Sequence, residues 1–420
     1  DLGANNRPVQ PGGAVKCRSC ATEFVGDSGG YRKAHVTPLR ARCPICSHVY
    51  GALAEESDIR PGNKILVNKF AYELGKPKRW DVIVFEFDQW KNYIKRLVAL
   101  PGETVRLHDG DLYINGKIER KTDHPFVQDE MWLQVSDSNV VENGLNDPAW
   151  SSKGTTWAPQ QERTRWSINH TAASGAPAAL NYNRSFDNYL NYNLARHGVG
   201  GRNHTQIGDK LVRFEISGVE GSGWLGCEIG DGDYTFLLTL PVGSATGNAS
   251  IFRIENEWTA EGPVAHPSGL RSDLPDFRLA KGTSTTIDFE NVDDRLVIRV
   301  GGDEIVRLDY VSTPDIDDPP RAENRSTLRL LGSDVRATIQ SIEVFQDLYY
   351  IGEGNFRSFA TERWKGITLG EGQYLAMGDN SASSSDGRFW GYVPESNLMG
   401  KALLVFWPAW PLNFQCKFIK

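Results

Sequence analysis

The sequence lacks an excess of positive charge, a long apolar run and a targeting segment. The 420 residues carry a formal net charge of −7. This argues against nucleic acid as the main partner, because phosphate binding needs a basic face. The longest apolar run, residues 402–412, is too short to cross a bilayer and contains Pro408 and Pro411. Nothing near Asp1 has the pattern of a signal peptide or a membrane helix.

Methionine is also scarce, whereas turn-forming residues are abundant. The chain has 3 Met against 42 Gly and 21 Pro. Short alternating segments separated by Gly, Pro and Asp occur in residues 62–118, and longer ones occur in residues 207–347. Such patterns are typical of strands, and the second group predicts an antiparallel β-sandwich. The sequence therefore predicts a mostly β protein.

Composition and periodicity divide the chain into five regions. We expect a Cys-rich region at 1–58 and a β domain in two parts, at 59–120 and 349–420. Between these parts we expect an irregular connecting region at 121–206, rich in Asn, Ser and Trp, and an inserted sandwich at 207–348. The segment 288–302 resembles a hairpin of concanavalin-like jelly rolls.

Four of the six cysteines form two Cys-x2-Cys pairs near the start of the chain. They are Cys17, Cys20, Cys43 and Cys46. This spacing predicts a zinc ribbon, in which four thiolates hold a structural zinc ion. Outside the cytoplasm the same thiols would meet oxidants, so disulfides are the alternative.

Lys95 lies in an alternating segment that predicts a strand. Alternation puts Tyr93 and Lys95 on one face and Ile94 and Arg96 on the other. A buried lysine has a lowered pKa and can act as a base, while Arg96 can stay hydrated. The alternative is an ordinary edge-strand charge.

Three segments, in order, resemble the conserved boxes of type I signal peptidase. They are residues 62–72, 92–103 and 378–391, the last beginning Gly-Asp-Asn. The resemblance implies that Lys95 is the catalytic base and that Ser384, by its place in the third box, hydrogen-bonds and orients it. Asp386 and Arg388 match a carboxylate and a guanidinium that brace the loop.

In this family the leader peptide lies extended beside the catalytic lysine. Tyr93 and Ile94 match walls of the pockets that accept its small side chains, although ordinary core positions are the alternative.

The nucleophilic serine of the family lies in a Ser-Met-x-Pro-Thr run, and the 420 residues contain no such run. We therefore expect an N-terminally truncated fragment, inactive alone, whose nucleophile and membrane anchor lie upstream. A subset of the family is similar in having a Cys-rich insertion after the serine box.

The resemblance implies a serine endopeptidase that needs no cofactor for catalysis. It would remove signal peptides with small residues before the cleavage site from secretory preproteins. It would act on the extracytoplasmic side of the bacterial cytoplasmic membrane. The alternative is a non-catalytic envelope protein on the same scaffold, whose sandwich binds a glycan or a protein partner.

Overall fold

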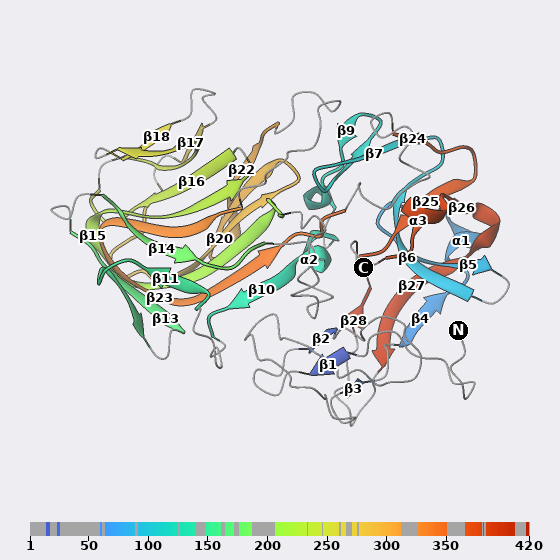
Figure 1. Cartoon of the computed structure of the whole chain (residues 1–420), viewed down its shortest axis with the longest axis horizontal. Helices are drawn as coiled ribbons and strands as arrows, with labels where there is room; N and C mark the ends of the chain where they lie inside the picture. The colour runs from blue at the N-terminus through green and yellow to red at the C-terminus, as the bar shows by residue number, and fades with distance from the viewer. Residues whose placement is uncertain are drawn as a thin grey trace, which may run out of the picture.

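The computed structural model places the chain in two β-rich bodies side by side (Figure 1). The structure describes residues 14–16, 23–25, 59–60, 64–88, 91–124, 127–139, 148–160, 164–171, 176–186, 206–232, 234–245, 247–259, 262–265, 271–274, 277–311, 326–350, 366–379, 381, 384–407 and 417–419. Cys17, Cys20, Cys43 and Cys46 lie outside the described residues, so the zinc ribbon stays a prediction. Among the described residues, no helix is long and apolar enough to cross a membrane.

The first body, which we call the split domain, is built from two stretches of chain. The elements of the first stretch are β4 (Lys64–Asn68), α1 (Ala71–Leu74), β5 (Val82–Asp88), β6 (Lys91–Ala99), β7 (Thr104–His108), β8 (Asp111–Ile114), β9 (Lys117–Ile118), η2 (Lys121–Asp123) and α2 (Val127–Met131). The elements of the second are β24 (Ile367–Thr368), β25 (Gln373–Met377), α3 (Gly387–Trp390), β26 (Val393–Pro394), η7 (Glu395–Asn397), β27 (Leu398–Trp407) and β28 (Lys417–Phe418).

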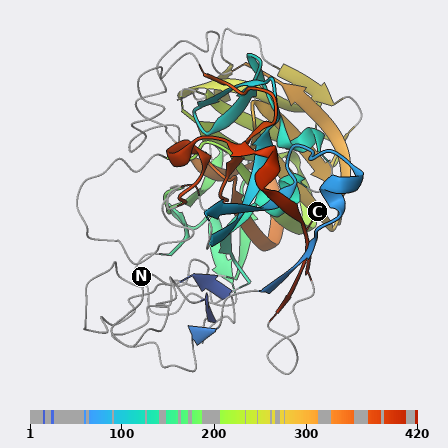
Figure 2. The ribbon, with the colours of Figure 1, turned by 90° about the vertical axis from the view of Figure 1, so that its right-hand side faces the viewer.

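Strands of the two stretches pair directly, so neither stretch makes the domain alone. The main sheet has the order β26-β25-β6-β5-β27-β28, with β4 also on β27, and a second sheet has the order β24-β7-β8-β9. In both sheets, a strand from beyond residue 366 lies beside one from before residue 119. Figure 2, which turns this body toward the viewer, shows the two stretches interleaved.

The second body is a β-sandwich formed by the chain between those stretches. Its strands are β10 (Leu133–Asp137), β11 (Trp150–Ser152), β12 (Trp157–Gln160), β13 (Arg165–Asn169), β14 (Ala178–Tyr182), β15 (Lys210–Asp231), β16 (Tyr234–Pro241), β17 (Ala249–Thr259), β18 (Gly262–Ala265), β19 (Arg271–Leu274), β20 (Thr285–Val292), β21 (Arg295–Val300), β22 (Asp303–Asp309) and β23 (Leu328–Gln346). The long strands β15 and β23 pair along most of their length. Register shifts at residues 215–224 bend this pair, so that its two halves contribute to different layers around one apolar core.

The expectation of an irregular region at 121–206 was wrong for its described part. Strands β10, β13 and β14 pair with β23, β11 pairs with β14, and β12 pairs with β13. The strands are short, and three tryptophans of this region are buried in the sandwich core: Trp150, Trp157 and Trp166. The sandwich thus begins at Leu133 rather than near residue 207.

Three further strands, β1 (Ala14–Lys16), β2 (Glu23–Val25) and β3 (Ile59–Arg60), form a small sheet with the order β2-β1-β3.

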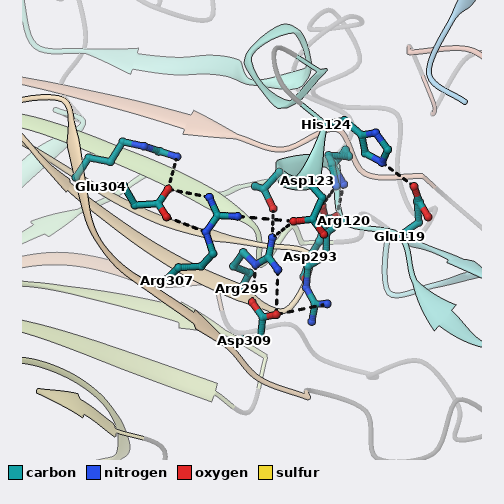
Figure 3. A network of polar contacts seen from close by, with 12 residues as sticks. Glu119, Arg120, Asp123, His124, Asp293, Arg295, Glu304, Arg307 and Asp309 are labelled. Carbon is teal, nitrogen blue, oxygen red and sulfur yellow. Dashed lines mark hydrogen bonds and ion pairs between the residues drawn. The ribbon is translucent and has the colours of Figure 1, made fainter.

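Polar contacts join the two bodies where the chain leaves the split domain (Figure 3). Arg120 donates to the backbone oxygen of Asp293, which lies in the turn between β20 and β21. Arg295 of β21 pairs with Asp123 at 2.5 Å and with Asp309 at 2.5 Å. Residues 119–124 are therefore tied to the hairpins of the sandwich.

Candidate active site on the split domain

Lys95 and Ser384 meet on the split domain, brought together by the pairing of β6 with β25. The Lys95 amine lies 2.9 Å from the Ser384 hydroxyl oxygen, although the two residues are 289 positions apart in the chain. Ser384 is buried, and Lys95 is half-buried. The structure thus brings the two predicted site residues into direct contact.

The surroundings of Lys95 favour its neutral form. Burial lowers its pKa, and so does the nearby positive charge of Arg388, while the carboxylates of Asp386 and Asp379 act in the opposite direction. The ring of Tyr93 lies on the same strand face, with its centroid 5.6 Å from the amine nitrogen. The geometry therefore suits a Lys95 that acts as a base beside the ring of Tyr93.

Asp386 and Arg388 form a fully buried pair behind Ser384. The Arg388 guanidinium donates to both carboxylate oxygens of Asp386, at 2.9 and 2.6 Å. It also donates to the hydroxyl of Ser381 at 2.7 Å. The second Asp386 oxygen accepts the backbone N–H of Gly378 at 2.9 Å. This network fixes both ends of the loop that carries Ser384, as charge-assisted bonds in a buried place do.

Tyr93 and Ile94 lie differently from each other. Tyr93 stacks on Phe87, with ring centroids 4.5 Å apart, and meets Phe85 edge to face. Ile94 projects to the opposite face of β6 and is 46% exposed. Tyr93 thus borders the Lys95 site directly, whereas Ile94 faces away from the amine.

Arg96, the residue after Lys95, lies differently from its prediction. We expected a hydrated side chain, but Arg96 is only 4% exposed and makes two hydrogen bonds to Asp379, of 3.0 and 2.9 Å. The two terminal nitrogens of its guanidinium, Nη1 and Nη2, also lie 3.5 Å from Oε2 of Glu130 in α2. The sequence signal for this ion pair was the position of Asp379 within the Gly-Asp-Asn box. Arg96 therefore clamps β6 to the loop that begins at Gly378.

One group of carboxylates among the described residues is close enough to hold a cation. Asp111, Asp209 and Asp293 have one oxygen each within 4.8 Å of one another. The Lys121 ammonium contacts Asp293 and also lies 2.9 Å from Asp347. An internal cation is thus already present in this buried cluster, which we describe as an ion-pair junction between the two bodies.

Comparison with known families agrees with this geometry. A profile described as "Signal peptidase, peptidase S26" matches residues 52–153 and 297–407, about half of the chain. The chain belongs to the signal peptidase family, peptidase S26. Both matched segments run beyond the split domain into the sandwich strands.

Individual members of the family match short parts of the chain. Signal peptidase I of Bacillus caldolyticus is 37% identical over 70 residues, which are 17% of this chain and 37% of that protein. Signal peptidase I V of Bacillus subtilis is 34% identical over 92 residues, or 22% of this chain and 53% of that protein. Signal peptidase I of Pseudomonas fluorescens is 46% identical over 71 residues, or 13% and 25%. The chain thus spans between a quarter and about half of the length of these relatives.

The similarity to solved structures is weak. The carbohydrate binding module CBM66 from Bacillus subtilis covers 48% of this chain, and 94% of the module is covered, with 14% identity and a TM-score of 0.27. The match to the laminarinase catalytic domain from Thermotoga maritima covers 52% of this chain and 99% of that domain, with 10% identity and a TM-score of 0.32. Likenesses this weak carry no information about a ligand of the sandwich.

Proposed function

We propose that this chain carries the general base, but not the nucleophile, of a type I signal peptidase, a serine endopeptidase that removes N-terminal signal peptides. The observation that carries the proposal is the 2.9 Å contact between the Lys95 amine and the Ser384 hydroxyl. The two residues occupy matching positions in two family boxes, and burial lowers the pKa of Lys95. In such an enzyme, a half-buried lysine beside a buried hydroxyl can serve as the general base.

In the proposed reaction, neutral Lys95 accepts the proton of a serine hydroxyl while the serine oxygen attacks the scissile carbonyl. The lysine then returns the proton to the leaving amine, and water hydrolyses the acyl-enzyme. Ser384 holds the amine in place throughout. The proposed nucleophile is a serine in a family box that the 420 residues do not contain, so these residues alone should be inactive.

The proposed substrates are secretory preproteins with small residues before the cleavage site, bound beside Lys95 with Tyr93 at the pocket wall. The proposed site of action is the outer side of the bacterial cytoplasmic membrane. Among the described residues, seven of the eight large apolar side chains that are exposed belong to the split domain, and they support a membrane-facing surface there; the eighth is Val311. The seven are Leu66, Phe70, Leu74, Phe87, Ile94, Phe389 and Tyr392.

The test is cleavage of a preprotein by a parent chain that includes the upstream residues. Lys95→Ala should lower kcat about 100- to 10,000-fold, the usual contribution of a general base, and Ser384→Ala should lower it less. Activity should rise with pH through the pKa of Lys95, because only the neutral amine accepts a proton. Lys91→Ala is the matched control, since Lys91 is exposed on the same strand.

Full activity of Lys95→Ala, or no cleavage by the parent chain under any condition, would support the rival function instead. In that rival the split domain is a scaffold without chemistry, and the sandwich binds a glycan or a protein partner. The retained contact between Lys95 and Ser384 favours the enzyme.

A structural zinc ion at Cys17, Cys20, Cys43 and Cys46 remains part of the proposal, resting on the cysteine spacing alone. Zinc content measured by elemental analysis, with Cys17→Ser and Cys43→Ser for comparison, would test it. One equivalent of zinc in the parent is expected, and intact disulfides without zinc would refute it.

A further inference from the structure

Helix α2 lies between the two bodies, where the chain passes from the split domain to the sandwich (Figure 1). Its two ends are anchored in the split domain, because Val127 and Met131 are buried in the same apolar cluster as Val98 of β6 and Leu375 of β25. Those two strands carry Lys95 and lead to the loop of Ser384. A displacement of α2 would therefore disturb the packing beneath both strands.

One side of α2 contacts the Arg96 clamp. The Glu130 carboxylate lies 3.5 Å from the Arg96 guanidinium, which also makes two hydrogen bonds to Asp379 and one of 3.3 Å to the backbone oxygen of Trp80. Arg96 follows Lys95 in the chain, and Asp379 follows Gly378. Glu130 is thus a third member of an ionic group located directly behind the Lys95–Ser384 contact.

The other side of α2 contacts the sandwich through a buried relay. The Gln128 side chain donates from Nε2 to one oxygen of Asp347 at 2.9 Å. The second Asp347 oxygen lies 2.9 Å from the Lys121 ammonium, which also contacts Asp293 in the β20–β21 turn. Gln128, Lys121, Asp293 and Asp347 are all nine-tenths buried or more. The position of the sandwich hairpin is therefore fixed relative to α2 by contacts that water does not screen.

We infer that α2 transmits the position of the sandwich to the active site, with Glu130 and Gln128 as positioning residues for the Lys95–Ser384 pair. The inference rests on the proposed function, since it concerns the same lysine. The five-residue helix contacts Arg96 on one side and Asp347 on the other, so it is held from both bodies. The sandwich is thereby a structural support of the catalytic machinery as well as an inserted domain.

The experiment is a pH titration of Lys95 by NMR of its side chain, assigned with Lys95→Arg, in the chain described here. Glu130→Gln removes a negative charge near Arg96, so the pKa of Lys95 should fall by on the order of 0.5 pH unit. Gln128→Met keeps every charge and breaks only the relay. It should shift the amide signals of Gly378 and Asp379 and also move the titration of Lys95.

Asp129→Asn is the matched control, because it removes the same charge from an exposed position on the same helix. It should move the Lys95 titration by less than about 0.1 unit, since exposed charges are screened by water and salt.

The inference is overturned if Gln128→Met and Glu130→Gln both leave the Lys95 titration and the Gly378 signals as they are in the parent. If Lys95 in the parent titrates at the ordinary lysine value, the proposed function fails instead. A lowered Lys95 pKa that does not respond to either variant refutes only the role of α2.

Discussion

At the scale of single residues, the Lys95–Ser384 contact depends on the absence of a side chain at position 378. A Cβ atom built on Gly378 would lie 2.1 Å from the Ser384 hydroxyl oxygen and 3.2 Å from the Lys95 amine. The backbone of Gly378 also donates to Asp386, so it cannot retreat without breaking that bond. Glycine at this position is therefore required by close approach.

Gly378→Ala should displace the Ser384 hydroxyl and lower the free energy of unfolding by about 1–3 kcal/mol, as overpacking does. The pKa of Lys95 should rise toward its ordinary value, because a displaced amine regains water. Urea denaturation and the Lys95 titration measure the two effects. Gly75→Ala is the control, since a Cβ there would lie 3.6 Å from its nearest neighbour, the backbone oxygen of Ala71. Equal behaviour of the two variants would contradict this account.

At the scale of elements, the sequence predicted strands where alternation is strict. The alternating segments expected within residues 62–118 include β4, β5 and β6, and those expected within residues 207–347 include β15 and β21. Alternation identifies such strands because one face of each is buried.

Other elements could not be predicted, because long-range contacts determine them. Strands β10–β14 have three to five residues each, too few for a reliable period. The burial of Arg96 depends on Asp379 and Glu130, and nothing near Arg96 in the sequence shows that both carboxylates converge on it. The boxes located Lys95 and Ser384, but the contribution of α2 became visible only in three dimensions.

The η2–sandwich junction allows a prediction at this scale. Lys121→Met would leave the buried carboxylates of Asp293 and Asp347 without their cation, at a cost of about 3–5 kcal/mol at pH 7. Burial raises the pKa of Asp347 to about 6. Between the ordinary aspartate pKa and about 6, the folded state therefore holds a proton that the unfolded state releases, so stability rises as pH falls through this window.

The loss in Lys121→Met should consequently be smaller at pH 5 than at pH 7, as measured by chemical denaturation at both values. Lys117→Met, at an exposed position on β9, serves for comparison and should change stability by less than about 0.5 kcal/mol. A loss that is independent of pH would show that uncompensated carboxylates are not its cause.

At the scale of the whole molecule, the chain leaves the split domain for the sandwich and returns from it at one place. Leu133 of β10 lies directly opposite Gln346 of β23 in an antiparallel register. Directly opposed residues in such a pair have Cα atoms about 4.5–5.5 Å apart. The insertion therefore interrupts the split domain no more than a short hairpin loop would.

Replacement of residues 134–345 by Asn-Gly should give a folded split domain, because a two-residue turn joins strands in this register. The shortened chain should be less stable than the whole, since Lys121 loses Asp293 and α2 loses its support. Backbone NMR would show whether β6 still pairs with β25, and thermal denaturation would give the stability. An unfolded product would mean that the split domain requires the sandwich to fold.

The closeness of Leu133 and Gln346 also bears on the order in which the chain folds. The 289 positions between Lys95 and Ser384 form a long loop, which must be closed before β6 can pair with β25. The sandwich is one continuous stretch and can fold by itself before the last strands are made. Once folded, it holds its own ends together and shortens the free chain, which lowers the entropic cost of closure by about 1 kcal/mol. The folded insertion therefore favours assembly, because it brings the second stretch of the split domain close to the first.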